Sequence, residues 1–228
     1  LERATRASVY AAADQIRQGY LQTAGGCRVG LCGCAYGQAA GQIDGIRQLS
    51  SVSVRIPHAV PGCADALVPQ LMKDGFCSTL ILSPPGGGKT TLLRECVRRL
   101  SDQGLRISLM DERGEIAAVQ NRTPQFDVGA NTDIMTGGQK AACCMMLLRA
   151  MRPDVLAFDE ISAPEDIEAM RIAAGCGVAL LATAHAQSVG ALRCRTLYRA
   201  LLDEHIFHRA VCITRSGGAR FYALEELP

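Results

Sequence analysis

The stretch from Thr79 to Thr91 reads Thr-Leu-Ile-Leu-Ser-Pro-Pro-Gly-Gly-Gly-Lys-Thr-Thr, and the rest of the chain is organised around it. Its apolar run predicts a buried strand, its prolines and glycines predict a tight turn, and a helix is expected to begin near Lys89. The turn nearly matches the pattern G-x-x-x-x-G-K-[ST], in which backbone N–H groups and a helix N-terminus surround a phosphate. The one mismatch is Ser83, which replaces the first glycine.

The residues of this loop have separate expected tasks. The three glycines lack a Cβ, so the backbone can close on a phosphate, and the two prolines fix φ in the turn. Lys89 is expected to reach the β- and γ-phosphates, and the Thr90 hydroxyl to ligate Mg²⁺. A Gly/Pro-rich loop that merely precedes a lysine is the structural alternative. The predicted ligands are ATP and Mg²⁺, and the predicted nucleotide-binding residues are Ser83, Pro84, Pro85, Gly86, Gly87, Gly88, Lys89, Thr90 and Thr91.

Composition excludes several classes of protein. The 228 residues fit one large domain or two small ones, and an apolar content of 48% supports a substantial aliphatic core. The net charge of +2 comes without a long basic run, which argues against a tail for nucleic acid or anionic lipid. No apolar run approaches the length of a membrane span, and no signal-peptide pattern is present. A chain of this size with a nucleotide site is expected to be cytoplasmic, where thiols stay reduced.

Eleven cysteines are a large and odd number for such a chain. The spacings Cys32-x-Cys34 and Cys143-Cys144 do not match the usual metal-binding pairs. In a reducing compartment free cysteines act as small hydrophobic residues, and this role is favoured over metal binding or disulfides.

The first part of the chain predicts a small α+β domain over residues 1–62. An apolar face predicts a helix over 5–18, and short strand-like runs follow. Pro57 and the pair Pro61-Gly62 end the region, so a domain boundary is placed near residue 62. The expected strands cover 20–23, 28–34, 42–46 and 51–56.

The second part, residues 63–228, alternates strands with helices, which favours an α/β fold with a parallel sheet covered on both faces. Strands are expected over 79–82, 106–111, 155–158 and 177–183, and helices over 64–72, 90–100, 139–151 and 189–202. A further helix opens at a capping box over 162–165 and runs to residue 174. Residues 120–138 are expected to form a loop, and 209–214 with 220–224 a closing hairpin.

Four apolar strands of this second part end in polar residues, at Ser83, Asp111, Asp159 and His185. In an open parallel sheet, ligands bind at the carboxyl ends of the strands, so these ends are expected to converge on one site. Asp159 fits the acidic residue that holds Mg²⁺ directly or through water. A turn cap is the structural alternative for it.

Two further carboxylates compete for the role of catalytic base. Glu160 could polarise the attacking water, and Glu112 with Glu115 forms a second candidate pair. A structural salt bridge is the alternative for whichever glutamate is not the base. His185 could contact the γ-phosphate and report the nucleotide state, or it could be a structural histidine. The arginines at 94, 98 and 99 are interpreted as a solvated helix face. The candidate catalytic residues are Glu160, Glu112, His185 and Lys89.

Several segments together resemble the stage III sporulation protein AA family, within the superfamily of type II and type IV secretion ATPases. They are the loop with its helix over 83–94, Asp111-Glu-Arg-Gly-Glu-Ile-Ala117, Thr132-Asp-Ile134, Phe158-Asp-Glu-Ile161 and Thr183-Ala-His185. Gly26–Gly30 and Ser50–Ile56 resemble the family as well. Ser83 agrees with this family, whereas Asn131 stands where the family tends to have arginine.

The resemblance implies a RecA-like P-loop ATPase core, preceded by a small α+β domain and assembled as a homo-hexamer. It also implies an acidic box over 111–115 and a histidine box at His185. The implied activity is Mg²⁺-dependent ATP hydrolysis that powers assembly of, or transport through, a membrane channel between mother cell and forespore. The hexamer would be peripheral at the cytoplasmic face of a membrane, docked on channel or secretion proteins.

Two other functions remain open, and so does the source of one catalytic residue. The chain could be a nucleotide-gated binding module with little turnover, or a motor on nucleic acid. The mild charge and scarce aromatic residues give no support to nucleic-acid binding. In the secretion ATPases the N-terminal domain of one subunit leans over the nucleotide of the next. Arg28 or Arg55 is therefore expected to act in trans, chosen from Arg17, Arg28, Arg47 and Arg55. A solvated sheet face is the structural alternative for each of them.

Overall fold

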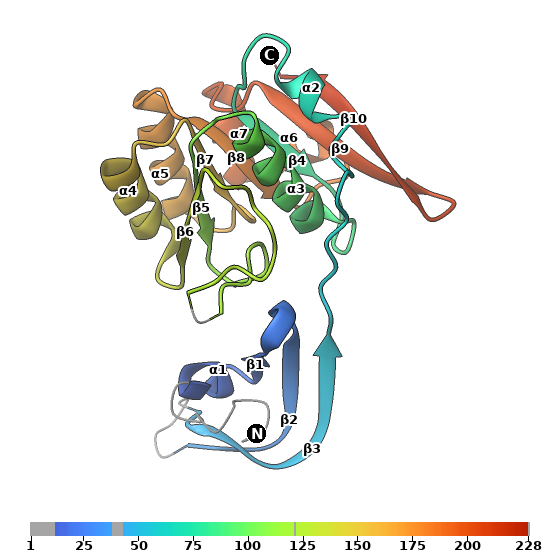
Figure 1. Cartoon of the computed structure of the whole chain (residues 1–228), viewed down its shortest axis with the longest axis vertical. Coiled ribbons are helices and arrows are strands. Elements are labelled where there is room, and N and C mark those ends of the chain that lie inside the picture. Colours follow the sequence, from blue (N-terminus) through green and yellow to red (C-terminus); the bar gives the residue numbers. More distant parts are fainter. Residues whose placement is uncertain (1–11, 38–42, 121, 228) are drawn as a thin grey trace. The chain divides into compact units, whose positions relative to one another are not determined.

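The structure is a computed structural model that describes residues 12–37, 43–120 and 122–227 (Figure 1). The chain divides into two compact units. The first comprises the described residues up to His58 and those within Ala118–Phe126, and the second comprises Ala59–Ala117 and the chain from Asp127 onward. The boundary expected near residue 62 would assign Ala118–Phe126 to the second part of the chain, whereas this segment groups with the first unit. Within that unit a Cβ at Gly26 would lie only 2.6 Å from the Cβ of Ala118.

The first unit is a small antiparallel sheet with a short helix, as the sequence predicts. It contains α1 (Ala13–Arg17), β1 (Tyr20–Gln22), the 3-10 turn η2 (Ala24–Gly26), β2 (Arg28–Tyr36) and β3 (Gly45–Arg55), in the sheet order β1-β2-β3. The start of the expected helix over 5–18 lies outside the described residues. The expectation of separate strands over 42–46 and 51–56 is wrong for the described residues, because β3 is one strand. The pairing of β2 with β3 changes register between Cys32 and Cys34. Gln48, on the opposite strand, has a φ of 46°, and the two strands pair on both sides of this irregularity.

The second unit is built on a seven-stranded sheet in the order β10-β9-β4-β8-β7-β5-β6. All neighbouring pairs are parallel except the C-terminal hairpin. This confirms the predicted α/β core with a parallel-rich sheet. The strands are β4 (Thr79–Leu82), β5 (Ile107–Asp111), β6 (Thr132–Thr136), β7 (Val155–Phe158), β8 (Ala179–Ala184), β9 (Arg209–Ser216) and β10 (Ala219–Glu226).

Helices cover both faces of this sheet (Figure 1). Strand residues such as Leu80, Leu156 and Leu180 pack into a core with α4, α5 and α7, while α3 contacts β4, β5 and β8. Because successive strand residues point to opposite faces, the alternating apolar runs supply both layers. The helices are α2 (Val68–Leu71), α3 (Lys89–Asp102), α4 (Lys140–Met151), α5 (Pro164–Gly175), α6 (Val189–Arg193) and α7 (Thr196–Asp203).

The structure corrects four local predictions in this unit. The expected loop over 120–138 contains β6, an edge strand that is only half-buried and so lacks a strong apolar pattern. The helix expected over 189–202 is interrupted, because Arg195 is extended, with φ −97° and ψ 122°. The helix expected over 64–72 reduces to α2. The carboxylate that caps α5 belongs to Asp166, which accepts the N–H groups of Ser162 and Ala163, and not to Glu165.

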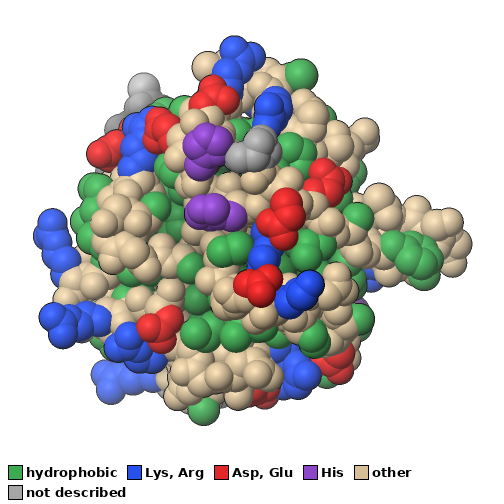
Figure 2. All heavy atoms as spheres, turned by 90° about the horizontal axis from the view of Figure 1, so that it is seen from above, with side chains coloured by type: hydrophobic (Ala, Val, Ile, Leu, Met, Phe, Trp, Pro, Cys, Tyr) green, Lys and Arg blue, Asp and Glu red, His purple; other side chains and the backbone are tan. Residues whose placement is uncertain are grey.

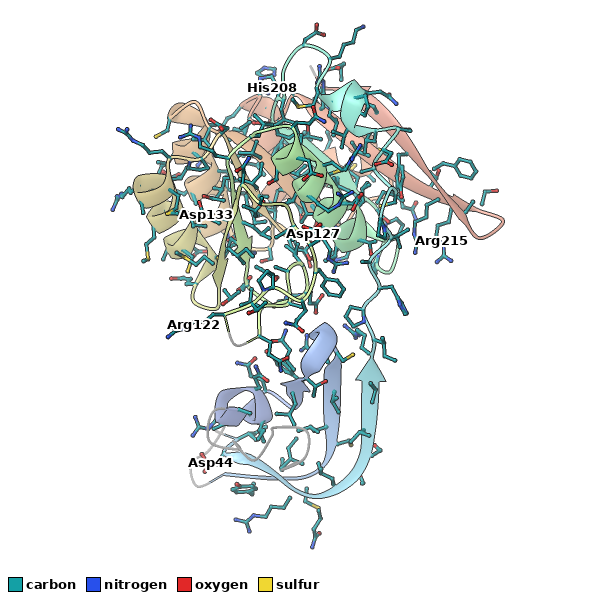
Figure 3. The ribbon with its side chains drawn as sticks, in the orientation of Figure 1. Asp44, Arg122, Asp127, Asp133, His208 and Arg215 are labelled. Atoms are coloured by element: carbon teal, nitrogen blue, oxygen red, sulfur yellow. The ribbon has the colours of Figure 1, made fainter. Side chains whose placement is uncertain are left out.

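The hairpin of β9 and β10 projects from the second unit (Figures 1 and 2). Arg215 lies on its protruding part (Figure 3). Its strands pair over their full length from Arg209↔Glu226 to Ser216↔Ala219. The side chain of Phe221 on β10 is 56% exposed.

All eleven cysteines are free thiols. Among the described residues, no helix has the length and apolarity that crossing a membrane requires.

Candidate functional site

The glycine-rich loop lies between β4 and α3, at the carboxyl edge of four neighbouring parallel strands. Gly86 and Gly88 have φ values of 71° and 103°, which side-chain-bearing residues rarely adopt. A Cβ at Gly87 would lie 1.5 Å from Oγ of Ser83, so serine in place of the first glycine requires glycine at position 87. The loop is thus shaped by its own packing as well as by its turn residues.

Lys89 points back into this loop. Its ammonium donates hydrogen bonds to the carbonyl oxygens of Ser83 at 3.2 Å and Pro84 at 3.4 Å, and it lies 2.7 Å from Nδ1 of His185. The residue is only 6% exposed. Burial lowers the pKa of Lys89, and the carboxylates of Asp159 and Glu160 oppose that shift.

His185 joins this lysine to a carboxylate. A charged ammonium has no acceptor, so Nδ1 of His185 must accept from Lys89 and the neutral ring then carries its proton on Nε2. That nitrogen lies 3.2 Å from Oε1 of Glu160. Three predicted catalytic residues from three different strand ends therefore form one continuous polar chain.

Asp159 faces the first turn of α3. Its Oδ2 accepts a hydrogen bond from the Thr90 hydroxyl at 2.9 Å, and its Oδ1 accepts from the Thr183 hydroxyl at 2.8 Å and from the backbone N–H of Glu160 at 3.1 Å. Thr183 is fully buried in β8. Sequence reasoning assigned it no role of its own, although a hydroxyl at the end of an apolar strand is a usable signal.

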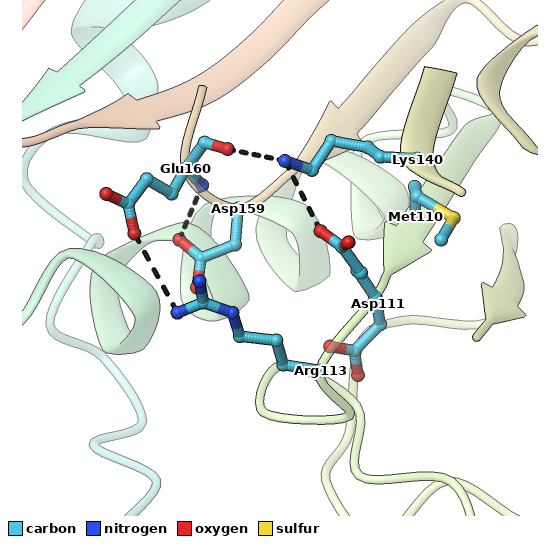
Figure 4. Close-up of a pocket in the computed structure, with 7 residues that line it drawn as sticks. Met110, Asp111, Arg113, Lys140, Asp159 and Glu160 are labelled. Atoms are coloured by element: carbon cyan, nitrogen blue, oxygen red, sulfur yellow. Dashed lines mark hydrogen bonds and ion pairs between the residues drawn. The ribbon is translucent and has the colours of Figure 1, made fainter. Parts of the chain in front are cut away.

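Both glutamates that compete for the role of catalytic base line a small pocket beside Asp159 (Figure 4). Oε2 of Glu160 lies 3.9 Å from the guanidinium of Arg113, and Oε2 of Glu112 lies 3.3 Å from Nζ of Lys140. Both carboxylates therefore have a cationic neighbour. The lining residues are Met110, Asp111, Glu112, Arg113, Lys140, Asp159 and Glu160.

Asp111 and Arg94 shape the acidic box. The Asp111 carboxylate accepts backbone N–H groups from Glu115 at 2.9 Å and Ala117 at 2.8 Å, so it closes the turn. Arg94 is 5% exposed and donates to the carbonyl oxygen of Glu115 at 2.6 Å. Interpreting Arg94 as part of a solvated face is wrong, because α3 presents this side chain to the turn after β5. Burial lowers its pKa, and Asp111 and Asp159 oppose that shift.

Two more residues at the site were missed from the sequence. Lys140, at the start of α4, has a side chain that is 8% exposed. Arg220, on β10, donates from Nε to the carbonyl oxygen of Gly87 at 3.0 Å. It is 133 positions from Gly87 in the chain, and only the fold brings the C-terminal hairpin to the loop. Lys140 could have been suspected, because it is a lysine that begins a helix whose next eight residues are all apolar.

Of the candidate arginines of the first unit, Arg17 ends α1, whereas Arg28, Arg47 and Arg55 lie on the sheet. Arg28 on β2 and Arg55 on β3 are directly opposite in the antiparallel register. The Arg28 guanidinium lies over the ring of Tyr20, 3.8 Å from its centroid, and that of Arg47 over Tyr36 at 4.0 Å. Like charges placed opposite each other repel, and the stacking of Arg28 on Tyr20 is one contact that offsets this repulsion.

The fold and the sequence both match known proteins. The chain superimposes on the ATPase DotB of Legionella pneumophila with a TM-score of 0.58 and 15% identity, over 87% of this chain and 57% of that one. The pilus retraction motor PilT, whose structure contains bound ADP, gives a TM-score of 0.56 at 15% identity, over 87% of this chain and 58% of PilT. The chain thus spans under two thirds of both structures, and at these identities the likeness shows the fold alone.

The sequence relationship is closer. Stage III sporulation protein AA of Bacillus subtilis is 35% identical over 224 residues, which are 96% of this chain and 72% of that protein. The family model for sporulation stage III, protein AA matches residues 1–220. The fold of the chain is that of DotB and PilT, and the chain belongs to the stage III sporulation protein AA family.

Proposed function

We propose that this chain binds ATP with Mg²⁺ on the loop over residues 83–91 and hydrolyses it. The observation that carries the proposal is the convergence of Lys89 and Thr90, in the first turn of α3 after β4, with Asp159, which follows β7 in the same parallel sheet. A structural lysine would not require a glycine-rich loop, a helix N-terminus and a hydroxyl–carboxylate pair beside it. All these residues fall in the range 63–228 that the sequence pattern assigns to an ATPase domain.

The donor atoms at this site fit Mg²⁺. Magnesium prefers oxygen ligands and is usually held by one or two protein groups together with phosphate and water. The Thr90 hydroxyl and Asp159 carboxylate, 2.9 Å apart, supply such oxygens. The described residues contain no cluster of three or more His, Cys, Asp or Glu side chains suited to a metal, so the nucleotide itself must complete the coordination. When bound, Mg²⁺ would neutralise charge on the β- and γ-phosphates.

The residues of this chain then divide the chemistry. Backbone N–H groups after Gly86 and the N-terminus of α3 stabilise the phosphates, and Lys89 exchanges its carbonyl and histidine partners for phosphate oxygens. A glutamate orients the attacking water and takes its proton. Glu160 is favoured over Glu112, because its carboxylate is joined through His185 to Lys89, whereas the Glu112 carboxylate is held by Lys140.

Family membership sets the biological context of this activity. We infer that a homo-hexamer uses ATP hydrolysis to power assembly of, or transport through, a membrane channel complex during sporulation. It would act at the cytoplasmic face of the membrane, held there by channel or secretion proteins. A nucleotide-gated module with little turnover is the competing function, because the polar chain from Lys89 to Glu160 could also transmit nucleotide state.

Phosphate release distinguishes the two. The parent protein with ATP and Mg²⁺ should release phosphate well above a Lys89→Ala background. Lys73→Ala is the matched control, because Lys73 is exposed and lies away from the loop. Saturable ATP binding without phosphate release above the Lys89→Ala level would favour the gated module. No binding by the parent would refute both.

A further inference from the structure

Lys140 makes an unusual set of contacts for a buried lysine. Its ammonium donates to the backbone carbonyl of Glu160 at 2.7 Å (Figure 4). It also lies 3.1 Å from the Asp166 carboxylate and 3.3 Å from that of Glu112. The Ser162 hydroxyl is 3.3 Å away. A buried ammonium is costly unless it is paired and hydrogen-bonded. Here the partners come from the segment after β7, from the acidic box and, through Asp166, from the first turn of α5.

Asp166 holds the same segment from the other side. Its side chain is 5% exposed. Its Oδ2 accepts hydrogen bonds from the backbone N–H groups of Ser162 at 3.0 Å and Ala163 at 3.1 Å, and the same oxygen pairs with the Lys140 ammonium. Lys140 and Asp166 therefore form a buried ion pair with the backbone of residues 160–163 bound on both partners. Glu160 lies at the start of this tethered stretch, directly after Asp159.

The tether limits where the Glu160 side chain can point. Its carbonyl is fixed by Lys140 and its N–H by Asp159 and the Thr183 hydroxyl, at 3.1 Å each. With both backbone groups bound, the carboxylate is directed to His185 and Arg113. The same lysine also pairs with Glu112, which occupies that carboxylate.

We propose that Lys140 is a positioning residue that fixes the backbone of Glu160, so that Glu160 rather than Glu112 acts as the catalytic base. This inference rests on the proposed ATP hydrolysis. Lys140 touches no reacting atom in this account and acts through the segment that it binds. Loss of the lysine should therefore affect the chemical step far more than nucleotide binding.

Amide hydrogen exchange tests the structural half without any need for turnover. In Lys140→Met the amides of residues 160–163 should exchange faster than in the parent, while those of β4 and α3 stay protected. Lys73→Met is the matched control and should change neither region. Unchanged protection of residues 160–163 in a folded Lys140→Met protein would overturn the proposal. If the parent hydrolyses no ATP, the proposed function fails, whereas this exchange result still decides whether Lys140 holds the segment.

Single-turnover hydrolysis with enzyme in excess tests the catalytic half. Lys140→Met should slow the chemical step by about 10- to 100-fold with ADP affinity close to that of the parent, because a small misplacement of a base costs that much. Lys140→Arg keeps the charge and should recover part of the rate. Equal loss of rate in Lys140→Met and Lys140→Arg, with lowered thermal stability in both, would indicate a purely structural lysine.

A double-mutant comparison identifies the glutamate through which Lys140 acts. Adding Lys140→Met to Glu160→Gln should cost little further rate, because the group being positioned is already gone. Adding it to Glu112→Gln should cost as much as it does in the parent. The reverse pattern would overturn the assignment. If Lys140→Met does not fold, the pair Lys140→Met/Asp166→Asn removes both buried charges and keeps an oxygen for the two amides, so the comparison is made on that background.

Discussion

The ammonium nitrogen of Lys89 lies 2.7 Å from Nδ1 of His185, and the opposite ring nitrogen lies 3.2 Å from Glu160. The lysine begins α3, the histidine follows β8 and the glutamate follows β7. A phosphate that drew Lys89 away would leave Nδ1 of His185 without this donor, while Nε2 of the same ring faces Glu160. Under the proposed function, phosphate binding on the loop over residues 83–91 would therefore change the surroundings of Glu160.

The first prediction separates Lys89 from His185. Lys89→Ala should abolish most nucleotide binding as well as turnover, because it removes the charge that the phosphates meet. His185→Ala should keep binding near the parent level and slow turnover by about 100-fold, because it removes only the link to Glu160. Equilibrium ADP binding and phosphate release, measured on both variants, check this. Loss of ADP binding in His185→Ala equal to that in Lys89→Ala would contradict the coupling.

The second prediction concerns the two glutamates. Glu160→Gln should bind ATP, fail to hydrolyse it and so trap the ATP state, since an amide fills the same space but cannot take a proton. Glu112→Gln should retain much more turnover, because its carboxylate is already paired with Lys140. The nucleotide retained after rapid gel filtration can be identified by chromatography. ATP trapped only by Glu112→Gln would move the base to the acidic box.

The third prediction concerns magnesium. Thr90→Val removes one oxygen ligand and the 2.9 Å hydrogen bond to Asp159. The Mg²⁺ concentration for half-maximal turnover should rise by about 10- to 100-fold, and the free energy of unfolding should fall by about 1 kcal/mol. Thr90→Ser keeps the hydroxyl and is the matched control. An unchanged Mg²⁺ dependence in Thr90→Val would remove Thr90 from the metal site.

The sequence predicts the parts of this site that lie at the ends of apolar strands. Ser83, Asp159 and His185 each follow such a run, and the parallel sheet order places those runs side by side. Contacts that form only in the tertiary structure could not be predicted from the sequence. Arg94 is read as solvated from its helix spacing, yet it turns inward to carbonyl oxygens after β5. Edge strand β6 was missed for the related reason that half-exposed residues carry little apolar pattern.

The fourth prediction concerns Arg220, which the hairpin brings to the carbonyl oxygen of Gly87 at 3.0 Å. Gly88 is next to that contact, since a Cβ there would lie 2.7 Å from the same Nε. Arg220→Ala should weaken ADP binding by about 10-fold, because a hydrogen bond from a charged donor is worth about 1.5–3 kcal/mol and helps to hold the loop. Arg149→Ala, on the exposed side of α4, is the control. Titration calorimetry measures the ADP affinity of the parent and of both variants. Equal affinities for all three would show that Arg220 does not contribute to ADP binding.

The last prediction concerns assembly. Lys89, Mg²⁺ and one glutamate leave part of the developing γ-phosphate charge unbalanced, and an arginine from a neighbouring subunit often completes such sites. Arg28 and Arg55 are the candidates, and because they are opposite each other on neighbouring strands, either could cover for the loss of the other. The double variant Arg28→Ala/Arg55→Ala should therefore lose turnover while keeping ADP binding. Arg47→Ala, on the same sheet and also stacked on a tyrosine, is the matched control.

A mixing experiment decides whether these arginines act in trans. Specific activity of the parent should rise with protein concentration as rings form. The Arg28→Ala/Arg55→Ala protein has an intact phosphate loop, and the Lys89→Ala protein has intact arginines. Mixing the two should restore part of the turnover, because a shared interface would combine one functional half from each chain. Activity that is independent of concentration, together with no recovery in any mixture, would mean that each chain completes its own site.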